Sequence, residues 1–126
     1  MVAVDTNVIV RVIVRDNLSQ TESVERFIQN GAWISILALA ETVWVLQSTY
    51  GLNEQEIEQA IEMLLRHRDF VVQDPEAVAD ALELFRAKPN LGFADCLMLE
   101  LARKAGHLPL GTFDRGLSKL PDTARL

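Results

Sequence analysis

Short apolar runs alternate along the chain with longer segments in which apolar residues recur at helical spacing. The short runs are rich in β-branched residues, which is typical of buried strands. We therefore predict five strands, at residues 2–5, 33–35, 70–72, 108–112 and 123–126. Helices are predicted directly after residue 5 and over residues 19–30, 37–50, 53–68, 75–88 and 93–105. Strands that alternate with helices favour a parallel sheet covered by helices on both faces, which is an α/β fold.

Residues that cap helices mark several of the predicted boundaries. Ser19 with Glu22, and Asn53 with Glu56, have the spacing of capping boxes, so each pair predicts the start of a helix. Gly106 follows the last periodic segment and predicts its end, because glycine readily adopts the left-handed conformation that closes helices.

Length and composition fit one domain with an ordinary hydrophobic core. The chain has 126 residues, of which 49% are hydrophobic, and its formal net charge is −6. This charge excludes the broad basic face of a non-specific nucleic-acid or membrane-surface binder, but it does not exclude a local nucleic-acid site. The only cysteine, Cys96, excludes an intrachain disulfide and a multi-cysteine zinc site. With no signal segment and no apolar run long enough to span a membrane, we expect a soluble cytoplasmic protein.

Four acidic residues stand where the surrounding sequence is apolar: Asp5, Glu41, Asp95 and Asp114. An ionised carboxylate in apolar surroundings is costly unless a partner offsets its charge. No Lys or Arg adjoins the first three of them in sequence. A divalent cation shared by all four is therefore a natural partner, and their hard oxygen ligands suit Mg²⁺ or Mn²⁺ better than zinc or copper.

The predicted elements allow these four side chains to converge. Asp5 ends the first strand and Asp114 follows the fourth, and open α/β sheets bind ligands beyond the carboxyl ends of strands, where the strand order reverses. Glu41 and Asp95 are each expected in the first turn of a helix. Taken singly, each acid also has a local explanation. Asp5 and Asp95 suit helix caps, Asp114 suits a turn, and Glu41 could pair with a distant arginine.

The segments that carry these acids resemble the motifs of a PIN domain, most closely those of the VapC-type ribonuclease toxins of bacterial toxin–antitoxin pairs. They occur in the family's order and span nearly the whole chain. The segments are Val4-Asp5-Thr6-Asn7-Val8, Ala40-Glu41-Thr42-Val43-Trp44-Val45-Leu46, Gly92-Phe93-Ala94-Asp95 and Thr112-Phe113-Asp114-Arg115.

The resemblance implies a single PIN domain over residues 1–126, with a five-stranded parallel sheet of order 3-2-1-4-5 flanked by helices. It also implies metal-dependent hydrolysis of RNA phosphodiester bonds that leaves a 5′-phosphate and a 3′-hydroxyl. The family's catalytic and metal-binding acids carry over to Asp5, Glu41, Asp95 and Asp114. Supporting or substrate-binding roles carry over to Asn7, Thr112 and Arg115. Gly92 stands where relatives often have another acid, so the number of metal ions stays open.

The family's partners are an RNA substrate, a cognate antitoxin that blocks the acidic groove, and a second copy of the chain. The basic residues nearest the motifs are the candidates for phosphate contacts: Arg11, Arg15, Arg115 and Lys119. A surplus of apolar residues on the two central helices is the candidate surface for the dimer or the antitoxin: Val43, Leu46, Ile57, Ile61, Leu64 and Leu65.

Two other classes of function stay open at this point. One is a Mg²⁺-dependent phosphotransferase or receiver-like domain, since dehalogenase-type phosphotransferases also begin with a strand and an aspartate and receiver domains also gather carboxylates around Mg²⁺. The dehalogenase-type enzymes, however, have a second Asp where this chain has Asn7, and receiver domains need a lysine after a late strand. The other class is a PIN-fold binding module without catalytic activity. The presence of an acidic residue at all four motif positions argues against this class. Cys96 has no evident base beside it and is expected to pack in the core.

Overall fold

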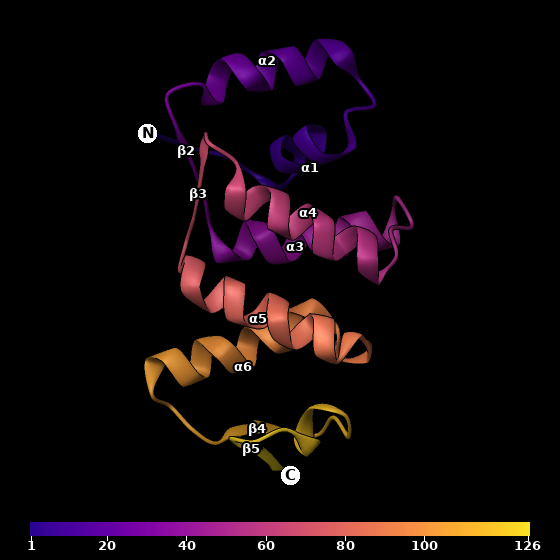
Figure 1. Cartoon of the computed structure of the whole chain (residues 1–126), viewed down its shortest axis with the longest axis vertical. Helices are drawn as coiled ribbons and strands as arrows, with labels where there is room; N and C mark the ends of the chain where they lie inside the picture. Colours follow the sequence, from indigo (N-terminus) through magenta and orange to yellow (C-terminus); the bar gives the residue numbers. More distant parts are fainter. The chain divides into compact units, whose positions relative to one another are not determined.

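The computed structural model describes residues 1–126, which form two compact units, Met1–Pro75 and Glu76–Leu126 (Figure 1). Unit 1 contains three strands and four helices in mixed order. They are β1 (Val2–Ala3), α1 (Thr6–Val14), α2 (Leu18–Ile28), β2 (Ala32–Ile34), α3 (Ile36–Ser48), α4 (Glu54–Arg66) and β3 (Phe70–Val72). The strands are parallel and lie in the order β1-β2-β3.

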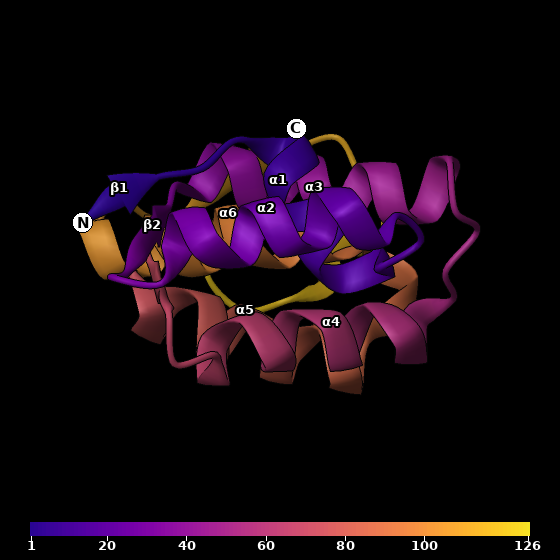
Figure 2. The same ribbon diagram turned by 90° about the horizontal axis from the view of Figure 1, so that it is seen from above.

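The sheet of unit 1 buries alternate residues, as the two-residue period of a strand requires. Ala32 and Ile34 of β2 are fully buried, whereas Trp33 between them is 38% exposed. In β3, Val71 is likewise 46% exposed. Helix α1 packs against both α2 and α3 (Figure 2), and α4 packs against β3. One face of β2 and β3 is therefore buried, while the face that carries Trp33 and Val71 is partly exposed.

Unit 2 contains two helices, two 3₁₀ turns and a pair of parallel strands. They are α5 (Pro75–Ala87), whose first residue is the last of unit 1, η1 (Pro89–Leu91), α6 (Phe93–Ala105), β4 (Leu110–Thr112), η2 (Leu117–Lys119) and β5 (Thr123–Arg125). Phe85 of α5 and Phe93 of α6 are buried and meet edge to face, with 6.1 Å between ring centroids. Leu99, Leu117 and Leu120 form a second buried cluster.

All five predicted strands are present, but they form a three-stranded and a two-stranded parallel sheet. The neighbours predicted inside each sheet, 3-2-1 and 4-5, are confirmed. The continuous five-strand order is not confirmed, because it also requires β1 beside β4.

Most predicted helix boundaries agree with the structure, and the differences have local causes. Asn53 and Glu56 form the predicted capping box, with both reciprocal hydrogen bonds present. The capping box predicted at Ser19 is wrong. The Asn17 side chain accepts a hydrogen bond from the Gln20 N–H at 3.1 Å, so α2 begins at Leu18 and Ser19 lies inside it. Asparagine caps helices as well as serine does, and here it comes first along the chain.

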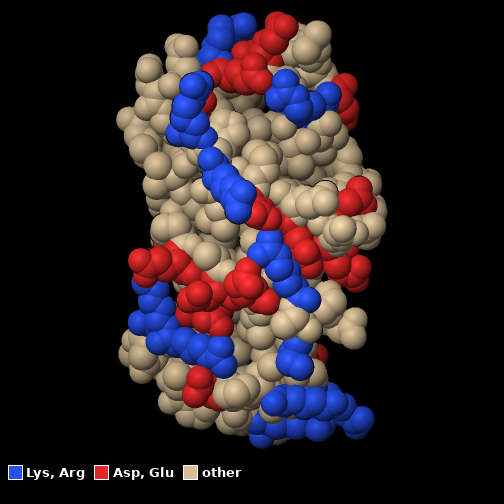
Figure 3. All heavy atoms as spheres, in the orientation of Figure 1, with Lys and Arg blue, Asp and Glu red and all other residues tan.

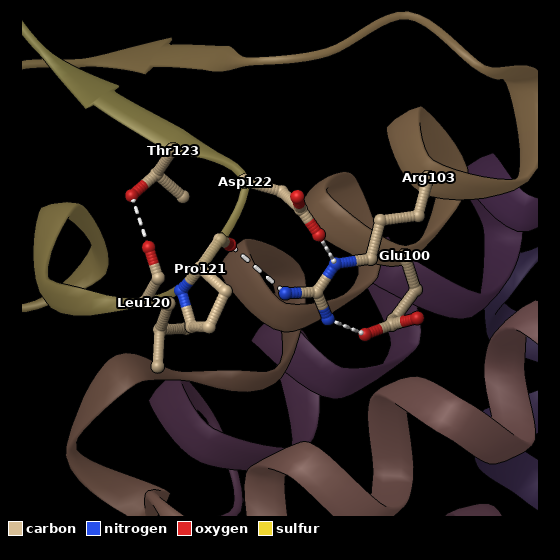
Figure 4. Close-up of polar contacts among 6 residues, drawn as sticks. All are labelled: Glu100, Arg103, Leu120, Pro121, Asp122 and Thr123. Carbon is tan, nitrogen blue, oxygen red and sulfur yellow. Dashed lines mark hydrogen bonds and ion pairs between the residues drawn. The ribbon is translucent and has the colours of Figure 1, made fainter.

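The end of α6 and the start of β5 are joined by one guanidinium group (Figure 4). Arg103 donates to Glu100 Oε1 at 2.6 Å, to Asp122 Oδ2 at 3.0 Å and to the Pro121 carbonyl at 2.9 Å. Asp122 has a left-handed backbone, with φ of +68°, in the tight turn that leads into β5. Arg103 therefore holds a strained turn and one edge of the two-stranded sheet against α6.

Replacing Arg103 with Ala is expected to lower the free energy of unfolding by about 1–3 kcal/mol, because hydrogen bonds to charged groups are lost and two carboxylates lose their partner. Urea unfolding followed by circular dichroism measures the change. Arg26→Ala is the matched control, because Arg26 is an exposed arginine of α2 with no ion pair. Equal unfolding midpoints for the two variants would show that the Arg103 network does not stabilise the fold.

Candidate functional site

Asp5 lies in unit 1 at the junction of β1 and α1, where it caps the helix. Its backbone is extended, and its Oδ1 accepts a hydrogen bond from the Val8 N–H at 3.1 Å. The local explanation of Asp5 as a cap is therefore correct for this oxygen. The other oxygen, Oδ2, accepts no hydrogen bond from the chain, and the side chain is exposed, so Asp5 can also bind a ligand.

Glu41 of α3 is linked by a hydrogen bond to Thr6, the residue that follows Asp5. The Thr6 hydroxyl donates a hydrogen bond to Glu41 Oε2 at 2.6 Å, which ties the first turn of α1 to α3. Glu41 lies in the second turn of α3, so its expected place in the first turn is wrong, and it has no arginine partner. Asp5, Thr6 and Glu41 line one side of a cavity of about 250 Å³, together with Ser35 at the start of α3.

The Thr6 hydroxyl is a site residue that the sequence analysis did not identify. The available signal was its position in the Asp5-Thr6-Asn7 triplet, but its partner is 35 residues away in the chain. Only the packing of α1 against α3 shows that this hydroxyl orients Glu41.

Asp95 and Asp114 form the acidic pair of unit 2. Asp95 is the third residue of α6, in its first turn as predicted, and it has no hydrogen bond or ion pair. Partial burial raises the pKa of Asp95 above its usual value, and the negative charge of Asp114 raises it further. The two carboxylates thus lie close enough for their charges to repel, and no Lys or Arg forms an ion pair with Asp95.

Asp114 is held in place by its own loop. Its Oδ2 accepts a hydrogen bond from the Leu117 N–H at 2.7 Å, and its backbone N–H donates to the Thr112 hydroxyl at 3.0 Å. The local explanation of Asp114 as a turn residue is therefore correct for Oδ2. Thr112, predicted to support the site or bind substrate, supports the loop. The other carboxylate oxygen of Asp114 accepts no hydrogen bond from the chain.

Each unit thus contributes two of the four predicted carboxylates. The structure contains no group of three or more His, Cys, Asp or Glu side chains that could hold a metal ion.

The raised pKa of Asp95 predicts how the stability of the metal-free chain depends on pH. The folded chain holds this proton more tightly than the unfolded chain, in which the pKa is near 3.8. The resulting stabilisation is fully present below that pH and is lost as the pH rises through the raised pKa. We expect the Asp95→Asn variant, whose side chain at this position cannot ionise, to lose less stability than the wild type as the pH increases over this range. Urea unfolding in EDTA at a series of pH values measures both, and parallel curves would contradict the expectation.

Two of the four basic residues predicted near the motifs are already paired. Arg11 forms an ion pair with Asp16, and Arg15 pairs with Glu25 at 3.1 Å. Arg115 and Lys119 have no ion pair and are exposed. Asn7 is exposed in the first turn of α1, where it lines a cavity of about 400 Å³ beside α2.

Cys96 and His67 have structural roles. Cys96 is fully buried, as expected, and burial together with the Asp95 charge raises the pKa of its thiol to about 11. The thiol is therefore protonated at neutral pH and packs as a core residue. His67 Nδ1 accepts a hydrogen bond from the Asp69 N–H at 3.0 Å, and its ring packs on Phe70.

The family model of the PIN domain matches residues 2–122, which is nearly the whole chain. The chain belongs to the PIN domain family. PIN domains are usually metal-dependent nucleases, so the match favours a hydrolase acting on nucleic acids over the phosphotransferase and receiver alternatives. No curated protein and no solved structure matches the chain significantly.

The donor set of this PIN domain fits a divalent cation. All four predicted ligands are carboxylates, which are the hard oxygen donors that Mg²⁺ and Mn²⁺ prefer. Three of them keep one oxygen free of hydrogen bonds from the chain, and Asp95 keeps both. No Lys or Arg forms an ion pair with any of the four. None of the helices is long and apolar enough to cross a membrane.

Proposed function

We propose that this PIN domain is a metal-dependent endoribonuclease and acts as the toxin of a toxin–antitoxin pair, as VapC-type proteins do. The observation that carries the proposal is the pair formed by Asp95 and Asp114. Burial and the Asp114 charge raise the pKa of Asp95, and no Lys or Arg forms an ion pair with either carboxylate. Such an arrangement is costly for the fold by itself and is useful when a cation binds there.

We further propose that residues 1–126 make one domain in which Asp5 and Glu41 join Asp95 and Asp114 around Mg²⁺ or Mn²⁺. The strand order that the resemblance implies, 3-2-1-4-5, would make β1 and β4 neighbours and so belongs to the same proposal. Asp5 follows β1 and Asp114 follows β4, and parallel strands place their carboxyl ends at one edge of a sheet. The junction of β1 with β4 is then the point at which the strand order reverses, where α/β sheets bind their ligands.

The four carboxylates have distinct roles in the proposed hydrolysis of RNA. A bound divalent cation supplies an activated water and stabilises the negative charge that develops on the phosphate. Asp5, Glu41, Asp95 and Asp114 would hold the cation, with the Thr6 hydroxyl positioning Glu41 and the Leu117 N–H fixing Asp114. One of these carboxylates accepts the proton of the attacking water. The products are a 5′-phosphate and a 3′-hydroxyl.

Two protein partners belong to this proposal, an antitoxin and a second copy of the chain. The apolar residues predicted to form their surface do not do so, because five of the six are buried in the core of unit 1 and Leu65 is half-buried. The exposed apolar residues of α3 are instead Leu37 and Trp44, two turns apart on one face of the helix. Light scattering at high concentration tests the dimer, and a clean monomer would contradict it.

The nuclease activity is tested with a pool of structured RNAs and the purified protein. We expect cleavage with Mg²⁺ or Mn²⁺, and none after removal of divalent ions with EDTA. Mass spectrometry of the products should find 5′-phosphates. Intact RNA under every metal condition, with a correctly folded protein, would contradict the nuclease and favour a binding module.

A further inference from the structure

We propose that a cleft in unit 2, formed by η1 and η2, binds a backbone phosphate of the RNA next to the phosphate that is cleaved. This inference rests on the proposed nuclease function and adds a subsite to it. The cleft has a volume of about 290 Å³. Its lining includes Lys88, Pro89, Asn90 and Leu91 on one side, with Gly116 and Lys119 on the other.

The cleft is basic because its two lysines keep their charge unpaired. Lys88 directly precedes η1 and Lys119 ends η2, and both are exposed without an ion pair. No acidic side chain lines the cleft. Two arginines of unit 2 are used internally, because Arg86 pairs with Glu83 and Arg103 pairs with Glu100. The two lysines therefore remain available for an anion from outside the chain.

The two units differ in net charge, and the difference favours the binding of an anion at the cleft in unit 2. Residues 1–75 hold eleven acidic and five basic residues, so they account for the whole net charge of −6. Residues 76–126 hold seven of each. Figure 3 shows Lys and Arg side chains over the region of β4 and β5. A polyanion such as RNA is therefore repelled less by unit 2 than by unit 1.

Gly116 connects the cleft to the acidic pair. A Cβ atom at this position would lie 3.0 Å from Leu91 Cδ2, which belongs to the wall of the cleft, and 3.4 Å from Asp114 Oδ2. The backbone of one residue thus separates the cleft from the Asp114 carboxylate. An RNA strand with one phosphate at the carboxylates can place a neighbouring phosphate in the cleft.

The chemistry of the lining suits a nucleotide better than a free anion. Lysine is a compact charge with three donors that binds phosphate oxygens without demanding one orientation. Pro89 and Leu91 supply an apolar wall for a ribose, and Asn90 adds an amide that can hydrogen-bond to it.

The test uses the Lys88→Ala, Lys119→Ala double variant and a short single-stranded RNA of mixed sequence with a fluorescent label. Binding is measured in EDTA, so that no cleavage takes place, over a series of salt concentrations. We expect about tenfold weaker binding, and a log–log salt dependence that is shallower by about 0.7–1.4, because each phosphate contact in single strands contributes about 0.7. The charge-conserving Lys88→Arg, Lys119→Arg variant should retain wild-type binding. Arg26→Ala, which removes an unpaired arginine from unit 1, should change the affinity little.

The outcomes separate the subsite from the nuclease. Unchanged affinity and salt dependence in a folded double variant would overturn the subsite, even if the wild type cleaves RNA. Loss of binding in a protein whose wild type cleaves no RNA would contradict the nuclease and leave the phosphate site standing. If a polyglutamate peptide binds more tightly than RNA, with the same dependence on the two lysines, the cleft binds an acidic protein and the proposal is wrong.

Discussion

Replacing Asp95 with Asn is expected to reduce RNA cleavage about 100-fold or more while the chain stays folded. The substitution keeps the size of the side chain and removes its charge, so the donor set loses a ligand with two unoccupied oxygens. The fold should tolerate the change, because the Asp95 carboxylate makes no hydrogen bond and is repelled by Asp114. In the absence of metal the variant should be at least as stable as the wild type.

The matched control for this experiment is Asp80→Asn. Asp80 is exposed in the middle of α5 and has no ion pair, so its loss changes the net charge equally. Initial rates with the same RNA pool, at saturating Mg²⁺, measure both variants. Equal turnover by Asp95→Asn and the wild type would remove Asp95 from the site.

Addition of Mg²⁺ or Mn²⁺ is expected to raise the melting temperature, and Asp5→Asn should abolish most of the rise. A ligand present at 100 times its Kd stabilises the folded state by about 2.7 kcal/mol. For a chain of this size, that corresponds to roughly 10 °C. The rise is expected because the cation offsets the repulsion among the carboxylates. Differential scanning fluorimetry with and without the metal measures it.

Comparing two substitutions at Asp5 separates its two roles. Asparagine still offers an oxygen to the Val8 N–H, so Asp5→Asn should keep the helix cap and lose only the metal response. Asp5→Ala loses both, and its metal-free stability should fall by about 1 kcal/mol. A metal-independent melting temperature in the folded wild type would show that the four carboxylates do not share a cation.

Local signals in the sequence were enough to predict the elements of this fold. The capping box at Asn53, the boundaries of α6 and the whole of β3 were predicted residue by residue, because each depends on neighbours within a few positions. The start of α2 was not predicted correctly, because Asn17 and Ser19 are both good caps and only the folded chain shows which one is used.

The site was predictable in composition and less so in geometry. Breaks in the apolar pattern identified Asp5, Glu41, Asp95 and Asp114. In unit 1, Thr6 next to Asp5 donates a hydrogen bond to Glu41, and in unit 2 the charge of Asp114 repels that of Asp95. The Thr6 hydroxyl and the pairing of Arg11 with Asp16 depend on side-chain geometry, which periodicity does not report. Lys88 was missed because it lies in no acidic motif, and only the cleft relates it to Lys119.

The hydrogen bonds on these carboxylates favour one size of ion over another. Val8, Thr6 and Leu117 each occupy one oxygen of Asp5, Glu41 and Asp114, so each of these groups offers a single oxygen to a ligand. Calcium commonly takes carboxylates through both oxygens and accommodates six to eight donors, whereas magnesium requires six at short, regular distances. In the proposed site, three of the four acids would each coordinate through a single oxygen, and we expect Mg²⁺ to bind there in preference to Ca²⁺.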